Sequence, residues 1–135
     1  MSYAVVRKLL EAALLAQSPT YPTSWENVPF SPTMGTAWQR ATLMPGRTLD
    51  PTLGDGFMRE VGVYQIDIYC APDKGPAEAV ARVEALRTWF KRGTSFVEGN
   101  VRVLVAGSPY LAPSMPDASW FRLTLSVPYL ADVMP

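Results

Sequence analysis

The sequence predicts a single α+β domain, with a mixed or antiparallel sheet and two main helices packed on one face. The chain has 135 residues, and 48% of them are hydrophobic, which is enough for one compact core. Apolar residues recur at helical spacing in two segments and at alternate positions in several others. The order helix, strands, helix, strands favours one sheet with the helices gathered on it, without repeats or linkers.

The first helix is predicted from Ser2 to Gln17. Ser2 can cap its first amides, and the segment is rich in alanine and leucine, which are strong helix formers. Pro19 and Pro22 then end it, because proline lacks the amide that a helix needs. The apolar positions at helical spacing are Val6, Leu9, Leu10, Ala13 and Leu14.

Two strands are predicted next, a short one over Thr23–Val28 and a longer one over about Ala37–Met44. Pro29 and Pro32 force a bend at Phe30-Ser31-Pro32 between them. The following residues, Pro45 to Arg59, show no periodicity and contain two prolines and three glycines. We therefore expect a long arm at about 45–59, and arms of this length in small domains usually serve function or order against a partner.

The segment Glu60–Ala71 has the clearest strand pattern in the chain. Gln65 and Asp67 fall on one face, which is therefore expected to be wet or to meet a polar neighbour. The opposite, apolar face carries Gly62, Tyr64, Ile66, Ile68 and Cys70. On that face, Cys70 is predicted to be a small buried hydrophobe and not a nucleophile.

A second helix is predicted from Pro76 to about Lys91, with Gly93 as its C-terminal cap. Glu78 and Arg82, four residues apart, are expected to pair on its outer face. Its apolar stripe is Ala79, Val83, Leu86 and Phe90. Two further strands are predicted at Val101–Ala106 and Ser119–Tyr129, with an irregular loop at about 108–118 between them.

Charge and composition argue against several function classes. The 12 basic and 12 acidic residues balance, whereas duplex-binding domains carry an excess of basic ones. The chain has no histidine and one cysteine, so it lacks the commonest general base and cannot form a disulfide within itself or a cysteine-built zinc site. Asp50 and Asp55 lie in a loop that fixes no geometry between them. We expect no enzyme activity, cofactor, metal or membrane span, and synthesis in the cytoplasm.

The order of the motifs along the chain carries more information than any one motif. The relevant segments are Trp25–Pro32, Trp38–Leu43, Gly62–Tyr69, Pro72–Gly75, Trp89–Gly93 and Trp120–Tyr129. In this order and spacing they resemble the tail terminator proteins of long-tailed bacteriophages. The resemblance covers roughly residues 1 to 131, which is the size of one domain.

The resemblance implies a structural virion protein at the head-proximal end of the tail. Such proteins form homohexameric rings that bind the last ring of tail tube protein, stop tube polymerisation and provide the docking surface for the head connector. Genome DNA would be a partner only as it passes through the lumen. The resemblance brings no catalytic residues with it.

The arm at 45–59 is the predicted contact with a neighbouring subunit or the tube. The candidate interface residues are Arg47, Asp50, Asp55, Phe57, Met58 and Arg59. Phe57 and Met58 could instead begin the next strand and serve the core. Deleting Thr48–Gly56 is expected to leave the monomer folded but to abolish ring formation or tube capping.

Two other functions remain open at this point. A head-completion, connector or other minor tail subunit would share the sheet-and-helix plan, since fold alone does not give function. A soluble domain that binds a small molecule, with its pocket between the sheet and the helix at Pro76–Lys91, belongs to a different class. A saturable thermal shift with a small molecule would support it.

Overall fold

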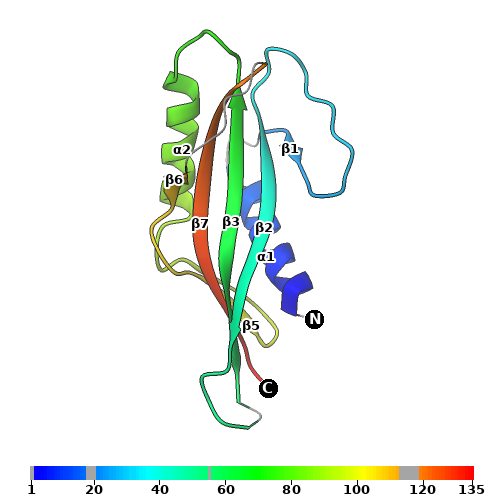
Figure 1. The fold of residues 1–135 in the computed structure, drawn as a ribbon, viewed down its shortest axis with the longest axis vertical. Coiled ribbons are helices and arrows are strands. Elements are labelled where there is room, and N and C mark those ends of the chain that lie inside the picture. The colour runs from blue at the N-terminus through cyan, green and yellow to red at the C-terminus, as the bar shows by residue number, and fades with distance from the viewer. Residues whose placement is uncertain (1, 18–20, 55, 113–118) are drawn as a thin grey trace.

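The computed structural model describes residues 2–17, 21–54, 56–112 and 119–135, and it shows an elongated α+β domain (Figure 1). The elements in chain order are α1 (Ser2–Ala16), β1 (Thr23–Ser24), β2 (Trp38–Leu49), β3 (Met58–Cys70), α2 (Ala77–Trp89), β4 (Ser95–Glu98), β5 (Val101–Val105), β6 (Tyr110–Ala112) and β7 (Phe121–Val133). No helix among these residues is long and apolar enough to cross a bilayer.

The strands of the described residues form one curled, mixed sheet in the order β1-β2-β3-β7-β5-β4, and β6 also pairs with β7. The β1–β2 pair is parallel, and the other pairs are antiparallel. The three longest strands, β2, β3 and β7, lie side by side along the long axis of the molecule (Figure 1). The predicted α+β class with a mixed sheet is confirmed.

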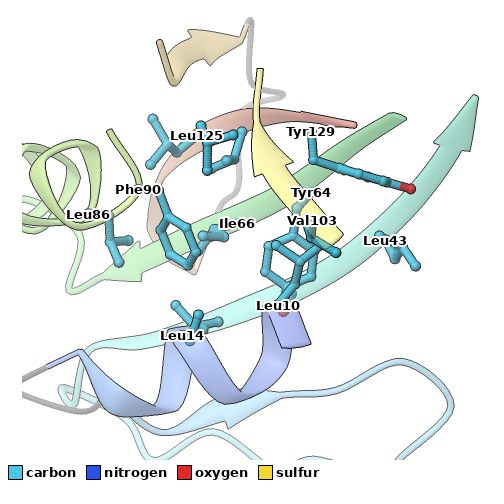
Figure 2. Packing of buried hydrophobic residues seen from close by; sticks show 14 of the residues in the cluster. Leu10, Leu14, Leu43, Tyr64, Ile66, Leu86, Phe90, Val103, Leu125 and Tyr129 are labelled. Atoms are coloured by element: carbon cyan, nitrogen blue, oxygen red, sulfur yellow. The ribbon is translucent and has the colours of Figure 1, made fainter. Parts of the chain in front are cut away.

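Both helices contribute to one hydrophobic core, as Figure 2 shows for Leu10 and Leu14 of α1 and for Leu86 and Phe90 of α2. Alternate residues of β3, which include Tyr64 and Ile66, reach the same core. The Trp89 indole N–H donates a 2.8 Å hydrogen bond to the Ala13 carbonyl and links the two helices directly. That both helices lie on one face of the sheet stays a prediction.

The predicted apolar stripes of the two helices are largely confirmed. The stripe of α2 is fully buried, and in α1 four positions are buried while Leu9 packs partly exposed against the core. Leu86 and Phe90 of α2, which have no exposed surface, fill the space between that helix and the sheet. The alternative of a domain that binds a small molecule predicted its pocket in this space, which these two side chains occupy.

The first strand and the arm differ from the prediction. The strand expected over Thr23–Val28 contains only Thr23 and Ser24, because Asn27 has φ 58° and turns the chain. Strand β2 does not stop at Met44 but continues to Leu49, so much of the expected arm is a β-hairpin. Pro45 and its neighbours are accommodated by a register shift between Pro45 and Thr48, at a place where β2 is an edge strand.

Two short strands were not predicted. Strand β4 pairs with β5 in a hairpin that turns at Gly99 and Asn100. Strand β6 lies inside the segment expected to be an irregular loop at 108–118, and it pairs with β7 through Leu111 and Leu125. The rest of that loop, residues 113–118, lies outside the described residues.

Arg82 corrects the predicted surface pair with Glu78. It is buried, only 3% exposed, and its guanidinium donates hydrogen bonds to the side-chain oxygens of Gln17 and Gln39, the latter at 3.0 Å. The same guanidinium lies 4.3 Å from the centre of the Tyr21 ring. Arg82 lies three residues after Ala79 and four before Leu86, on the buried stripe of α2. Its place on this face of the helix, and not its charge, therefore decides that it is buried.

Candidate functional site

The turn that joins β2 and β3 projects from the end of the sheet (Figure 1), and the half of β2 that leads into it pairs with β3 alone, while β3 itself also pairs with β7. Along β2, buried and less buried residues alternate as far as Leu43, and the residues from Met44 to Thr48 are all exposed. Leu53, in the turn that joins the two strands, is 100% exposed. In this part of the sheet, none of the described residues buries the side chains of β2 from Met44 to Thr48. We call residues 44–59 the hairpin arm.

The predicted interface residues are spread over the hairpin arm. Arg47 lies on β2 and Asp50 just after it, and both are exposed. Asp55 lies outside the described residues. Met58 begins β3 and is 37% exposed, and Phe57, just before it, is partly buried. Neither belongs to the hydrophobic core clusters, so Met58 does begin the strand but does not serve the core.

Arg59 is held by its own chain. Its guanidinium donates two hydrogen bonds to the Asp132 carboxylate of β7, at 2.7 and 3.1 Å. It also lies 5.6 Å from the centre of the Phe57 ring. The hydrogen bonds and the negative charge of Asp132 raise the pKa of Arg59. The bidentate pair fixes the start of β3 against the end of β7, next to the turn of the hairpin arm.

Two glycines allow the strands to approach closely where the hairpin arm meets the body. A Cβ at Gly62 would lie 2.6 Å from the Met44 carbonyl oxygen and 2.7 Å from the Tyr129 hydroxyl. A Cβ at Gly46 would lie 2.8 Å from the Val61 carbonyl oxygen. Such distances leave no room for a side chain, so both positions require glycine for close packing.

A second site, which the sequence did not predict, lies at the other end of β2 and β3. Four aromatic side chains pack together there, outside the main core. The Trp38 and Tyr69 rings stack with centres 4.0 Å apart, and Phe30 stacks on Trp38 at 5.1 Å. Trp120 meets Trp38 edge-on at 5.9 Å. No local sequence pattern brings these rings together, because they come from separate segments of the chain.

Two arginines border these rings. The Arg40 guanidinium lies 5.4 Å from the centre of the Trp38 ring and 5.5 Å from that of Tyr69, and it donates a 3.3 Å hydrogen bond to the Tyr69 hydroxyl. The Arg122 guanidinium lies 5.9 Å from the centre of the Tyr69 ring. Together with Phe30 and Trp120 these groups line an open cleft of about 350 Å³, which we call the aromatic–arginine cleft.

One polar group in this cleft has no partner. The Trp38 side chain is only 4% exposed, and within the described residues its indole N–H has no hydrogen-bond acceptor. Below the rings, Asp67 is buried and accepts a 2.6 Å hydrogen bond from the Thr124 hydroxyl. The cleft thus combines flat apolar surface, two cations and a buried donor, which suits an apolar group that carries a carboxylate or carbonyl.

The described residues offer little for catalysis. They contain no cluster of three or more potential metal ligands. Burial, together with a hydrogen bond to Glu78, raises the pKa of Cys70 to about 12, so its thiol stays protonated at neutral pH. Cys70 is 3% exposed and lies in the main core, as predicted.

Comparisons with known proteins identify a family and a solved structure that are similar to this chain. The family model described as phage tail terminator protein matches residues 4–129. A solved structure of another protein superposes with a TM-score of 0.73 at 23% sequence identity, over 100% of this chain and 97% of the other, which shows a shared fold. Among curated protein sequences, none matches this chain.

Proposed function

The chain belongs to the phage tail terminator protein family, and from this premise we propose that it forms the ring that caps the tail tube. The family is one of structural tail proteins and not of enzymes, so the protein is a structural component of the virion tail. In the proposal, six copies form the ring, which binds the last ring of tube protein and stops tube polymerisation. Its other face docks to the head connector, and genome DNA passes through its lumen.

The hairpin arm is the observation that carries this proposal. It forms one end of the sheet, exposes the side chains of Met44 and Arg47 on the edge strand β2, and presents a fully exposed Leu53 in its turn. An edge strand and a projecting turn with exposed apolar side chains offer a contact surface for another chain. The Arg59–Asp132 pair and the close glycine contacts hold it in one orientation, which lowers the entropy lost on binding.

Within the hairpin arm, we propose that Arg47, Asp50 and Met58 contact the neighbouring subunit or the tube. Phe57 and Arg59 instead support them from the start of β3, where Arg59 binds Asp132. Asp55 keeps its predicted role as an interface residue on sequence grounds alone.

Reconstitution with the tail tube protein of the same phage tests the proposal. Mixed with this protein, growing tubes should stop and carry a ring of six subunits at one end in electron micrographs. Labelled microscopy of whole particles should place the protein at the head-proximal end of the tube. Uncapped tubes together with a label along the tube or at the neck would favour another tail or connector subunit.

A shortened hairpin tests the role of the arm. Replacing residues 50–58 by Asn-Gly keeps Leu49 opposite Arg59 and closes the hairpin with a favoured two-residue turn. We expect a folded monomer with the far-ultraviolet circular dichroism of the wild type, and loss of rings and capped tubes. Normal capping by this variant would contradict the role of the arm.

A further inference from the structure

We propose that the aromatic–arginine cleft of one copy of this chain receives the hairpin-arm tip of the next copy. The proposal rests on the proposed ring and identifies the two surfaces that meet at each subunit contact. The six residues that carry it on the receiving side are Phe30, Trp38, Arg40, Tyr69, Trp120 and Arg122.

The cleft needs a partner that is both apolar and acidic. No carboxylate among the described residues forms an ion pair with Arg40, although the buried Asp67 lies opposite it on β3, and the Arg40 guanidinium lies near the Trp38 and Tyr69 rings and donates to the Tyr69 hydroxyl. The buried Trp38 N–H still requires an acceptor. Burying these groups under a neighbour that supplies an acceptor and a carboxylate would satisfy both needs.

The tip of the hairpin arm has this chemistry. Residues 48–57 include Asp50 and Asp55 and no lysine or arginine. Leu53, which lies between them in the sequence, is fully exposed, and a single exposed leucine at a projecting turn is the size of an anchor for an aromatic-lined cleft. The tip is therefore complementary to the cleft in charge and in polarity.

A chain cannot make this contact with itself. The cleft lies where β2 begins, at Trp38, and the tip lies beyond Leu49 where β2 ends (Figure 1). Eleven residue steps of extended strand separate these points by about 36 Å. The contact must therefore join two different patches on two copies, and a head-to-tail contact of this kind builds a closed ring when the rotation between copies closes.

Site-directed cross-linking tests the pairing. One batch of protein carries Leu53→Cys at the tip and another carries Ser119→Cys at the rim of the cleft, and a short bismaleimide is added to the mixture. The native Cys70 is buried and protonated, so wild-type protein serves as the blank. We expect a cross-linked dimer in the mixture, and a ladder of higher oligomers when one chain carries both substitutions. The dimer yield should exceed that of random collision by at least about tenfold, because docking raises the local thiol concentration.

Matched controls separate docking from collision. Glu84→Cys, on an exposed position of α2, replaces Ser119→Cys and should give no dimer above the blank. Adding Arg40→Glu to the Ser119→Cys chain should lower the dimer yield, and Arg40→Lys should retain most of it. If the Glu84 pair cross-links as well as the Ser119 pair, the proposal is wrong.

The same cysteines distinguish this inference from the proposed function. Protein that caps tubes but shows no Leu53–Ser119 cross-link in the capped ring overturns the inference and leaves capping intact. A Ser119→Cys cross-link to tube protein would show that the tube fills the cleft, which also overturns it. A specific Leu53–Ser119 cross-link without any tube capping would support the pairing and count against the capping role.

Discussion

The two halves of β2 show how one strand can serve two purposes. From Gln39 to Leu43, alternate side chains are buried, and Ala41 and Leu43 lie in the main core. From Met44 to Thr48, every side chain is exposed, although the strand keeps its partner β3. Both halves pair with β3, although the second contains the register shift between Pro45 and Thr48, and the two halves differ in what covers their side chains.

This difference divides the molecule into a body that provides the stability of the fold and a hairpin arm that is available for assembly. The body draws on the hydrophobic effect, because both helices pack over strand residues that are fully buried. The hairpin arm relies on strand pairing, one ion pair and two close glycine contacts. We therefore expect substitutions in the body to change folding, and substitutions at the tip to change assembly alone.

The largest expected effect contrasts the core with the tip. Phe90→Ala removes a fully buried ring and should lower the free energy of unfolding by about 3–5 kcal/mol. Leu53→Ala should change the free energy of unfolding by less than about 0.5 kcal/mol, because the side chain is fully exposed and its removal takes away no buried contact. Urea titrations of both variants measure the contrast. A Leu53→Ala variant as unstable as Phe90→Ala would abolish the distinction between body and arm.

A substitution at Gly62 tests the close strand contact where the hairpin arm meets the body. Gly62→Ala should lower the free energy of unfolding by about 1–3 kcal/mol, because its Cβ would collide with the Met44 carbonyl and the Tyr129 hydroxyl. Gly107→Ala is the matched control, since its Cβ would meet Pro128 at an ordinary 3.5 Å. Urea unfolding of the two variants checks this. Equal effects at both positions would mean that the close approach is not a constraint.

The smallest expected effect concerns pH, at the point where the buried half of β2 ends. Burial disfavours the charge of Glu26, but hydrogen bonds from Arg7, at 2.8 Å, and from the Leu43 amide, at 2.7 Å, outweigh it and lower the pKa of Glu26. A carboxyl with a lowered folded pKa stabilises the fold above its unfolded pKa of about 4.3, and this contribution is lost as the pH falls through the folded value.

Glu26→Gln tests this while keeping an oxygen that can accept from Leu43. At pH 7 the variant should be less stable by under about 1 kcal/mol, since the group is partly exposed and screened by solvent. The difference from wild type should shrink as the pH falls below about 4. Unfolding curves at both pH values measure it, with Glu84→Gln on the outside of α2 as the control. A difference that grows on acidification would contradict the assigned role of Glu26.

Much of the fold could be predicted from local patterns. The stripe of α2 and the apolar face of β3 follow from spacing alone, because each packs against a single continuous core. Strand β4 could have been found as well, since Gly99-Asn100 between Val97 and Val101 is a hairpin signal. Arg82 was misplaced because its charge was given more weight than its position on the buried stripe.

The interaction surfaces were harder to predict, for a physical reason. The prolines and glycines of the hairpin arm hide its strand character, because the edge position and the register shift that tolerate them are set by tertiary structure. In the aromatic–arginine cleft, Trp38, Tyr69 and Trp120 are brought together by pairing between distant strands. No window of the sequence contains that information.

The pairing of β3 with β7 also has a mechanical consequence. Every residue of β3 from Met58 to Cys70 has a partner on β7, and the tip of the hairpin arm points along the same axis. A pull on the tip along that axis would slide β3 past β7 and load all of these hydrogen bonds together. A sideways pull would open them one after another. The domain should therefore resist tension best in the direction in which its arm points.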